Sequence, residues 1–234
     1  MPNPIASLQI RPMVDFLLLF DLDGTLVDNL PDLTSALNSV LGERGHAPLL
    51  EQEVRSMLGD GIAAVLVRGF AARGLGRAEA MDTLSRFISI YEANAMTLSQ
   101  PYPDVRETLV ALRSRGYTIG LCTNKPQRAT IDVLRGFKLD ELFDGVAGGD
   151  RFGAKKPNPG HLLGLINELG ARVERTAMIG DSENDANAAH AASLPLLLMR
   201  YGYAQSDPAR LGAARVLDRF EELPKALEAL SLVP

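Results

Sequence analysis

The segment Phe16–Leu26, with the sequence FLLLFDLDGTL, constrains the fold more than any other part of the chain. Its first five residues are apolar, and a short apolar run ended by polar residues and glycine predicts a strand buried on both faces. Such strands belong to parallel sheets, which bind ligands at the carboxyl edge of the strands. Asp21 and Asp23 follow this run at once and form an oxygen-donor pair suited to Mg²⁺. The competing interpretation is a strand that ends in a solvated Asp-Gly turn.

Length, composition and charge limit the kind of protein to which this strand belongs. A chain of 234 residues holds one large domain, or one domain with a smaller insertion. The net charge of −5 argues against a nucleic-acid binder. The single cysteine, Cys122, lies in an apolar run and is expected to be a buried thiol in a reducing cytoplasm. The first dozen residues look like a loose tail rather than a signal peptide, and no apolar stretch is long enough to span a membrane.

A long helical pattern separates the first strand from the next one. Apolar residues recur at helical spacing directly after the strand, at Leu30, Leu33, Leu37, Val40 and Leu41. The helical pattern continues without a strand to about Met96, whereas a normal crossover contains a single helix. We therefore predict that residues 29–98 form an inserted α-helical cap and that residues 14–28 and 99–234 form the core. The two prolines of Ser99–Val105 indicate a hinge where the chain returns to the sheet.

The rest of the chain alternates short apolar runs with amphipathic segments. This alternation predicts an α/β fold with a Rossmann-like parallel sheet and right-handed crossovers. The predicted strands are Tyr117–Cys122, Phe143–Ala147, Thr176–Ile179 and Leu196–Met199. The predicted helices are Val105–Arg115, Gln127–Gly136, His161–Leu169, Asp185–Ala192 and Leu223–Leu230. Because polar residues follow the ends of several strands, we expect them to meet at one edge of the sheet.

Four motifs at these strand ends resemble those of the haloacid dehalogenase superfamily of Mg²⁺-dependent phosphotransferases. They are DLDGT at 21–25, Thr123 after an apolar strand, Lys156 directly before Pro157, and GDSEND at 180–185. The helical insertion resembles the mobile cap of that superfamily. The runs DLDGTLVDNLPDL, VRSMLGDG, CTNKP and KKPNP are similar to bacterial phosphoglycolate phosphatases. The resemblance implies a small phosphorylated metabolite as substrate, with 2-phosphoglycolate as the best guess, and leaves monomer or homodimer open.

The resemblance assigns the reaction to four aspartates. Hydrolysis of phosphate monoesters is so slow without a catalyst that a nucleophile, a metal ion, an acid and a cation must act together. Asp21 is the expected nucleophile, which forms an aspartyl-phosphate, and Asp23 is the expected general acid and then base. Mg²⁺ is expected at Asp21, at Asp23 through its backbone carbonyl, and at Asp181. Asp185 completes the metal site and orients metal-bound water.

Three further residues are expected to act on the phosphoryl group. Thr123 donates its hydroxyl to a phosphoryl oxygen, with help from the backbone N–H of Asn124. Lys156 supplies a fixed positive charge beside Asp21. The competing interpretation of Lys156 is a solvated loop lysine, a role that suits the adjacent Lys155 better.

Other residues are assigned to substrate binding. Gly24 and Thr25 complete the first motif, and Gly24 allows the backbone to approach a ligand closely. In the cap, Arg55 and the turn that contains Gly59 and Gly61 are candidates for contact with the non-phosphoryl end of the substrate. An arginine on the surface of a helix is the competing interpretation of Arg55.

Two other functions fit parts of the pattern. One is a sugar-phosphate phosphatase or mutase of the same superfamily, although mutases commonly carry another residue at the position of Thr25. The other is a receiver-like phospho-acceptor module, which also places an aspartate, a threonine and a lysine at strand ends with Mg²⁺. A helical cap argues against a receiver, since a receiver gains nothing from a lid. A dehalogenase is disfavoured because those enzymes lack the acid at Asp23.

Overall fold

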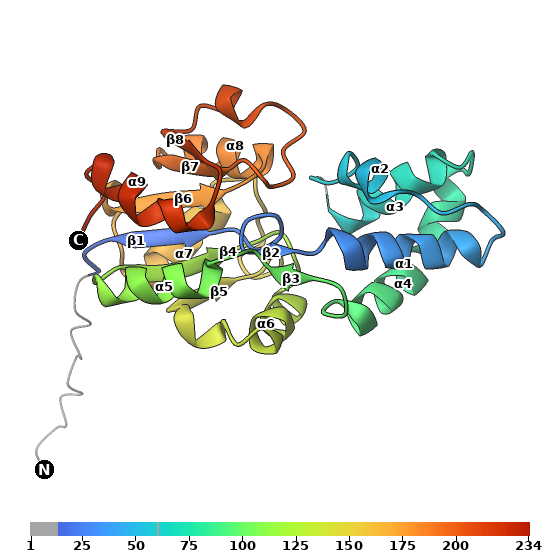
Figure 1. Cartoon of the computed structure of the whole chain (residues 1–234), viewed down its shortest axis with the longest axis horizontal. Helices are drawn as coiled ribbons and strands as arrows, with labels where there is room; N and C mark the ends of the chain where they lie inside the picture. The colour runs from blue at the N-terminus through green and yellow to red at the C-terminus, as the bar shows by residue number, and fades with distance from the viewer. Residues whose placement is uncertain (1–13, 60) are drawn as a thin grey trace, which may run out of the picture.

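A computed structural model of the chain describes residues 14–59 and 61–234. It consists of a sheet covered by helices and a smaller helical unit beside it (Figure 1). The expected N-terminal tail and Asp60 lie outside the described residues. Within the described residues, no helix has both the length and the apolar character needed to cross a membrane.

The centre of the larger unit is a six-stranded sheet with the order β5-β4-β1-β6-β7-β8. Every neighbouring pair of strands is parallel, and Leu17 of β1 pairs with Thr118 of β4 and Thr176 of β6. This sheet confirms the predicted α/β fold class. The strands are β1 (Leu17–Phe20), β4 (Thr118–Cys122), β5 (Gly145–Ala147), β6 (Thr176–Gly180), β7 (Leu196–Met199) and β8 (Arg215–Leu217).

Helices cover both faces of the sheet. Leu18 and Phe20 of β1 pack towards α5, α6 and α9, whereas Leu17 and Leu19 pack towards α7 and α8. All four side chains are fully buried, which explains why the sequence of β1 is continuously apolar. These helices are α5 (Val105–Ser114), α6 (Gln127–Gly136), α7 (Gly160–Glu168), α8 (Glu183–Ala191) and α9 (Leu223–Ala229). Short 3₁₀ turns lie at Asp140–Leu142, Val173–Arg175, Pro208–Arg210 and Phe220–Glu222.

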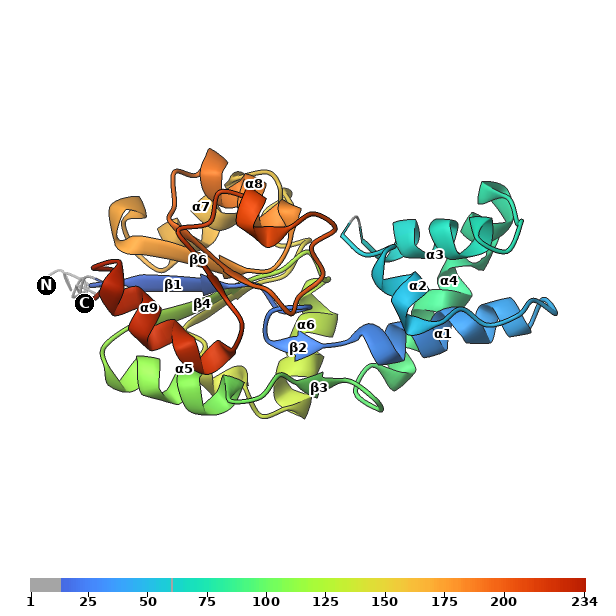
Figure 2. The same ribbon diagram turned by 45° about the horizontal axis from the view of Figure 1, so that its top comes forward.

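Over the residues that the structure describes, the smaller unit contains four helices, which lie to one side of the sheet (Figure 2). Its apolar core consists of its own residues together with Tyr203 from the loop after β7. Leu37, Leu66, Phe70 and Phe87 are fully buried at its centre. A separate core allows this unit to keep its shape if it shifts relative to the sheet. The helices are α1 (Leu30–Gly42), α2 (Glu51–Arg55), α3 (Ile62–Ala71) and α4 (Arg77–Asn94).

Two segments of chain connect the sheet unit with the helical unit, and they pair with each other as a small antiparallel ladder. The strands β2 (Val27–Asp28) and β3 (Gln100–Pro101) pair with each other. Next to them, the carboxylate of Asp32 accepts hydrogen bonds from the backbone N–H groups of Leu98 and Ser99, each at 2.9 Å. The sequence predicted a hinge here but no strands, because a two-residue strand is too short to produce an alternating pattern.

Candidate active site

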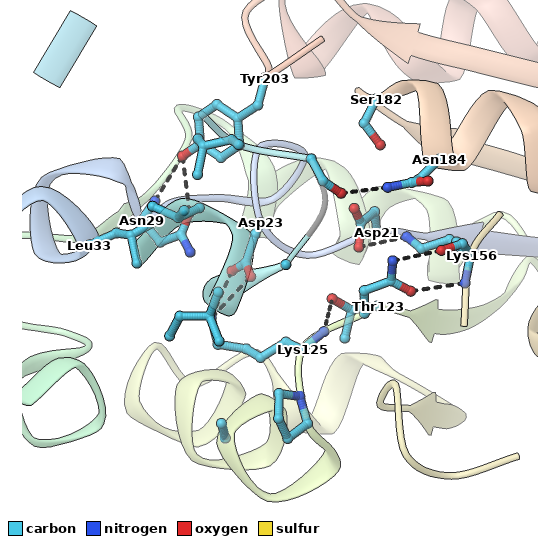
Figure 3. A pocket seen from close by; sticks show the side chains of 18 of the residues that line it. Asp21, Asp23, Asn29, Leu33, Thr123, Lys125, Lys156, Ser182, Asn184 and Tyr203 are labelled. Carbon is cyan, nitrogen blue, oxygen red and sulfur yellow. Dashed lines mark hydrogen bonds and ion pairs between the residues drawn. The ribbon is translucent and has the colours of Figure 1, made fainter. Parts of the chain in front are cut away.

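The carboxyl ends of three adjacent strands meet at one side of a cavity (Figure 3). Asp21 follows β1, Thr123 follows β4 and Asp181 follows β6, and these strands are neighbours in the sheet. The helical unit forms the opposite side of the cavity, which has a volume of about 260 Å³. The expected gathering of polar residues at one edge of the sheet therefore appears in the structure.

Three buried carboxylates form a candidate metal site, and two of them, Asp21 and Asp181, line this cavity. Asp21, Asp181 and Asp185 each offer an oxygen, and the three oxygens lie within 4.8 Å of one another. Burial raises the pKa of Asp21 to about 7 and holds the pKa of Asp181 well above its usual value. A divalent cation among these oxygens would favour their ionised forms. Since carboxylate oxygens are hard donors, the site fits Mg²⁺.

Lys156 provides the positive charge nearest to this cluster. Its Nζ lies 2.8 Å from Oδ1 of Asp21 and 2.6 Å from Oδ1 of Asp185, and the residue is 3% exposed. Burial opposes the charge, but the carboxylates of Asp185 and Asp21 outweigh burial and raise the pKa of Lys156. The side-chain amide of Asn124 holds the backbone of Lys156 through two 2.9 Å hydrogen bonds: it donates to the carbonyl of Lys156 and accepts from the N–H of Lys156. Lys155, by contrast, is exposed.

Gly24 and Thr25 hold the carboxylate of Asp181 in place. The hydroxyl of Thr25 donates to Oδ1 of Asp181 at 2.6 Å, and the backbone N–H of Tyr203 donates to Oδ2 at 2.7 Å. Gly24 has φ +86°, and a Cβ there would lie only 2.4 Å from Oδ2 of Asp181. The sequence assigned Gly24 and Thr25 to substrate binding, but the described wall of the cavity does not include them. Their visible contacts position the metal-site carboxylate instead.

Asp185 is fixed by the start of α8. Its Oδ2 accepts hydrogen bonds from the backbone N–H groups of Asp181 and Ser182, both at 3.1 Å, and from the hydroxyl of Ser182 at 2.7 Å. Ser182 is the N-cap of the helix, and the two residues form a capping box. The helix therefore begins at Glu183, two residues earlier than predicted, and its first turn aims Asp185 at the cluster.

Thr123 lies at the end of β4 and lines the cavity. Its hydroxyl oxygen accepts the backbone N–H of Lys125 at 3.2 Å, which leaves its own proton free to be donated. The backbone carbonyl of Thr123 lies 3.1 Å from Nε2 of His161, so this histidine supports the strand end. Cys122 is fully buried, as predicted, and burial raises the pKa of its thiol to about 12.

Asp23 lies outside the three-carboxylate cluster, and its side chain is paired with Lys125. The Nζ of Lys125 lies 3.1 Å from Oδ1 and 3.0 Å from Oδ2 of Asp23. The same ammonium donates to the hydroxyl of Tyr91 in α4 at 3.0 Å. The sequence analysis gave Lys125 no role, although it belongs to the CTNKP run. Its place two residues after Thr123, at a strand end, was the available signal.

The helical unit contributes the opposite side of the cavity. Gly59 and Gly61 line it, and their contact with the substrate stays a prediction. Arg55 does not belong to the described cavity wall; its guanidinium donates to the backbone carbonyls of Tyr201, at 2.6 Å, and Gly202. Arg55 thus attaches the cap to the loop after β7, and in this arrangement it does not face the substrate space.

The chain matches the model of the haloacid dehalogenase-like hydrolases over residues 18–199. It is 41% identical over 211 residues to a phosphoglycolate phosphatase from Rhodospirillum rubrum, with 88% of each chain covered. It is also 41% identical over 209 residues to a phosphoglycolate phosphatase from Caulobacter vibrioides, again covering 88% of each. A crystal structure of a predicted phosphoglycolate phosphatase from Haemophilus somnus superposes with a TM-score of 0.85 at 31% identity, covering 92% of this chain and 99% of the other.

The chain therefore belongs to the haloacid dehalogenase-like hydrolase family. Within that family it is a phosphoric monoester hydrolase.

Proposed function

We propose that this chain is a Mg²⁺-dependent phosphatase that hydrolyses 2-phosphoglycolate through an aspartyl-phosphate on Asp21. The observation that carries the proposal is the position of the Asp21 carboxylate, which lines the cavity, contacts Lys156 and belongs to the candidate metal site. The names of the relatives at 41% identity support 2-phosphoglycolate as the substrate.

In the first step, an oxygen of the Asp21 carboxylate attacks phosphorus in line with the ester bond. The bond between phosphorus and the ester oxygen breaks, and its electron pair leaves with that oxygen. The protonated carboxyl group of Asp23 gives its proton to the leaving oxygen, so that this oxygen leaves as the hydroxyl group of glycolate and not as an alkoxide. The products of the step are glycolate, an aspartyl-phosphate and an ionised Asp23.

In the second step, water attacks the phosphorus of the aspartyl-phosphate. Asp23 takes a proton from this water as the new phosphorus–oxygen bond forms. The bond between phosphorus and Asp21 breaks, which releases inorganic phosphate and restores the Asp21 carboxylate. The proton taken from water returns Asp23 to the form that begins the next cycle.

The other residues of the site hold and neutralise the phosphoryl group. Lys156 keeps a fixed positive charge beside Asp21, and the Thr123 hydroxyl with the backbone N–H of Asn124 donates to phosphoryl oxygens. Mg²⁺ held by Asp21, Asp181 and Asp185, with the backbone carbonyl of Asp23, would offset the repulsion between the nucleophile and the anionic substrate. Because these groups are held before substrate arrives, little reorganisation is needed during the reaction.

The helical unit, residues 29–98, acts in this proposal as a cap over residues 14–28 and 99–234. Its side of the cavity carries several aliphatic side chains, which limit the space for the leaving group and help to exclude water during phosphoryl transfer. These side chains are Leu33, Leu58, Ile62, Val65 and Ile88, and they lie beside the polar side chains of Asn29, Tyr91 and Glu92.

A panel of phosphate esters tests the proposal. The purified chain is incubated with 2-phosphoglycolate, sugar phosphates, nucleotides and p-nitrophenyl phosphate, each with Mg²⁺ and with a chelator. We expect phosphate release to be fastest from 2-phosphoglycolate, to stop with the chelator and to return with excess Mg²⁺. Faster release from a sugar phosphate would overturn the substrate, and release unaffected by chelation would overturn the metal dependence.

A further inference from the structure

Lys125 lies where the core meets the cap, yet the reaction described above does not use it. Lys125 is the third residue after the end of β4 and is only 9% exposed. Its ammonium group faces both carboxylate oxygens of Asp23 in the core (Figure 3). It also donates to the hydroxyl of Tyr91 in the cap. A buried lysine is costly unless its charge is paired, and this one is paired inside the cavity.

The donors of Lys125 are fully used by these contacts. An ammonium group has three N–H donors, and the structure provides three acceptors at 3.1, 3.0 and 3.0 Å. The ion pair of Lys125 and Asp23 lies at the cavity, where the side chain of Asp23 is 27% exposed and the side chain of Lys125 is 6% exposed. Lys125 therefore has no donor left for the substrate, and its effect must pass through Asp23.

We propose that Lys125 is a positioning residue, which holds the carboxyl group of Asp23 in the orientation needed to accept a proton from water in the second step. This inference rests on the proposed function, because it assigns Lys125 to the hydrolysis of the aspartyl-phosphate. Contact with both carboxylate oxygens fixes the orientation of the group as well as its distance, which a single hydrogen bond does not.

The contact with Tyr91 connects this arrangement to the cap. The hydroxyl of Tyr91 accepts from Lys125 and, at 2.8 Å, from the side-chain amide of Asn29. Tyr91 belongs to α4, and Asn29 lies between β2 and α1, where the chain enters the cap. The cap therefore helps to hold Lys125, and through it Asp23, when it is seated as in this structure.

Burst kinetics with p-nitrophenyl phosphate separate the two steps. Its leaving group departs as a stable anion, so that the first step needs little help from an acid, whereas the second step still needs a base. Wild type and Lys125→Met are mixed rapidly with this ester, and p-nitrophenolate is followed through the first turnover and into the steady state. Lys225→Met, at an exposed lysine of α9, is the matched control.

For Lys125→Met we expect the rate of the burst to stay within about threefold of wild type, while the steady-state rate falls by at least about tenfold. The burst then approaches one p-nitrophenolate per active site, because the aspartyl-phosphate accumulates. Tyr91→Phe is expected to lower the ratio of the steady-state rate to the burst rate by about twofold to fivefold. Lys125→Gln keeps one donor group, and its steady-state rate is expected to lie between those of wild type and Lys125→Met.

Two results would overturn the role of Lys125. One is an unchanged steady-state rate, and the other is an equal loss in both phases, which indicates a structural effect on the whole site. If Lys125→Met fails to fold in thermal unfolding, Lys125→Gln and Tyr91→Phe carry the test with the same criterion. Wild type that releases phosphate from no ester would instead contradict the proposed function itself.

Discussion

The two sides of the cavity differ in chemistry and in the way they are held. The core side carries charged side chains at the ends of adjacent parallel strands, and its buried lysines, Lys125 and Lys156, are paired with carboxylates. The cap side carries many aliphatic side chains and is attached to the core through polar contacts that include those of Arg55 and Lys125. From this difference we infer that, in the proposed function, the sheet sets the reaction and the helical unit governs access and substrate choice.

The two sides of the cavity also differ in how firmly their residues are held. Strand β1 is fully buried between two layers of helices, so the position of Asp21 is tied to the stability of the whole sheet. The core of the cap consists of its own residues together with Tyr203, so in the proposed function we expect the cap to shift as one unit relative to the sheet. Substitutions on the core side should therefore change the rate of the reaction, and those on the cap side should change binding.

The largest effect is expected for Asp21→Asn. An amide oxygen is a poor nucleophile, so turnover of 2-phosphoglycolate should fall by about 10⁴-fold or more while the chain stays folded. Phosphate release measures the turnover, and thermal unfolding shows whether the chain stays folded. Substantial remaining activity in a folded Asp21→Asn protein would refute the covalent route.

The second effect is expected for Asp181→Asn, which removes a charge from the candidate metal site but keeps the side-chain shape. We expect turnover to fall by about 10²-fold at saturating substrate and the Mg²⁺ concentration needed for half activity to rise by about tenfold or more. Asp218→Asn, at an exposed carboxylate paired with Arg200, is the control. An unchanged Mg²⁺ requirement would remove Asp181 from the metal site.

The third expectation concerns pH. In the metal-free protein, burial raises the pKa of Asp21 to about 7 and that of Asp181 in the same direction. Mg²⁺ must displace these protons at low pH, so its apparent affinity should rise with pH towards 7, by about tenfold per pH unit for each proton displaced. Calorimetric titration in two buffers with different ionisation enthalpies counts the protons. Mg²⁺ affinity that stays constant from about pH 5.5 to about pH 7.5 would contradict this linkage.

The smallest effect is expected for Arg55→Ala in the cap. Loss of its hydrogen bonds to the backbone carbonyls of Tyr201 and Gly202 should raise KM by about threefold to tenfold, with kcat within about twofold. Arg86→Ala, at an exposed arginine of α4 that pairs with Glu43, should change neither constant. If Arg55→Ala changes the preference between substrates instead, the arginine reaches the substrate in another position of the cap.

Most of the sheet could be predicted because its strands are buried on both faces. Five residues were assigned to the first strand and four form it, and the strands at Thr118, Thr176 and Leu196 were predicted to within a residue or so. The edge strand β8 was missed because it has three residues, of which Arg215 is exposed. Neither β2 nor β3 was predicted, since pairing between segments far apart in the chain leaves no local pattern.

The site was predictable where a residue follows a strand and belongs to a motif. Asp21, Asp181 and Lys156 come together as the motifs suggested, although their roles in the reaction remain predictions. The contact between Lys125 and Tyr91 was not foreseen, because these residues meet only when α4 packs over the end of β4. Long-range contacts of this kind depend on the placement of the cap, which no local pattern encodes.

The stereochemical course at phosphorus tests the central claim most directly. A phosphate ester made chiral with oxygen isotopes is hydrolysed in isotopically labelled water, and the configuration of the released phosphate is determined. Two successive in-line displacements, first by Asp21 and then by water, each invert phosphorus, so this account predicts net retention. Net inversion would mean that water attacks the substrate directly and would contradict an aspartyl-phosphate on Asp21.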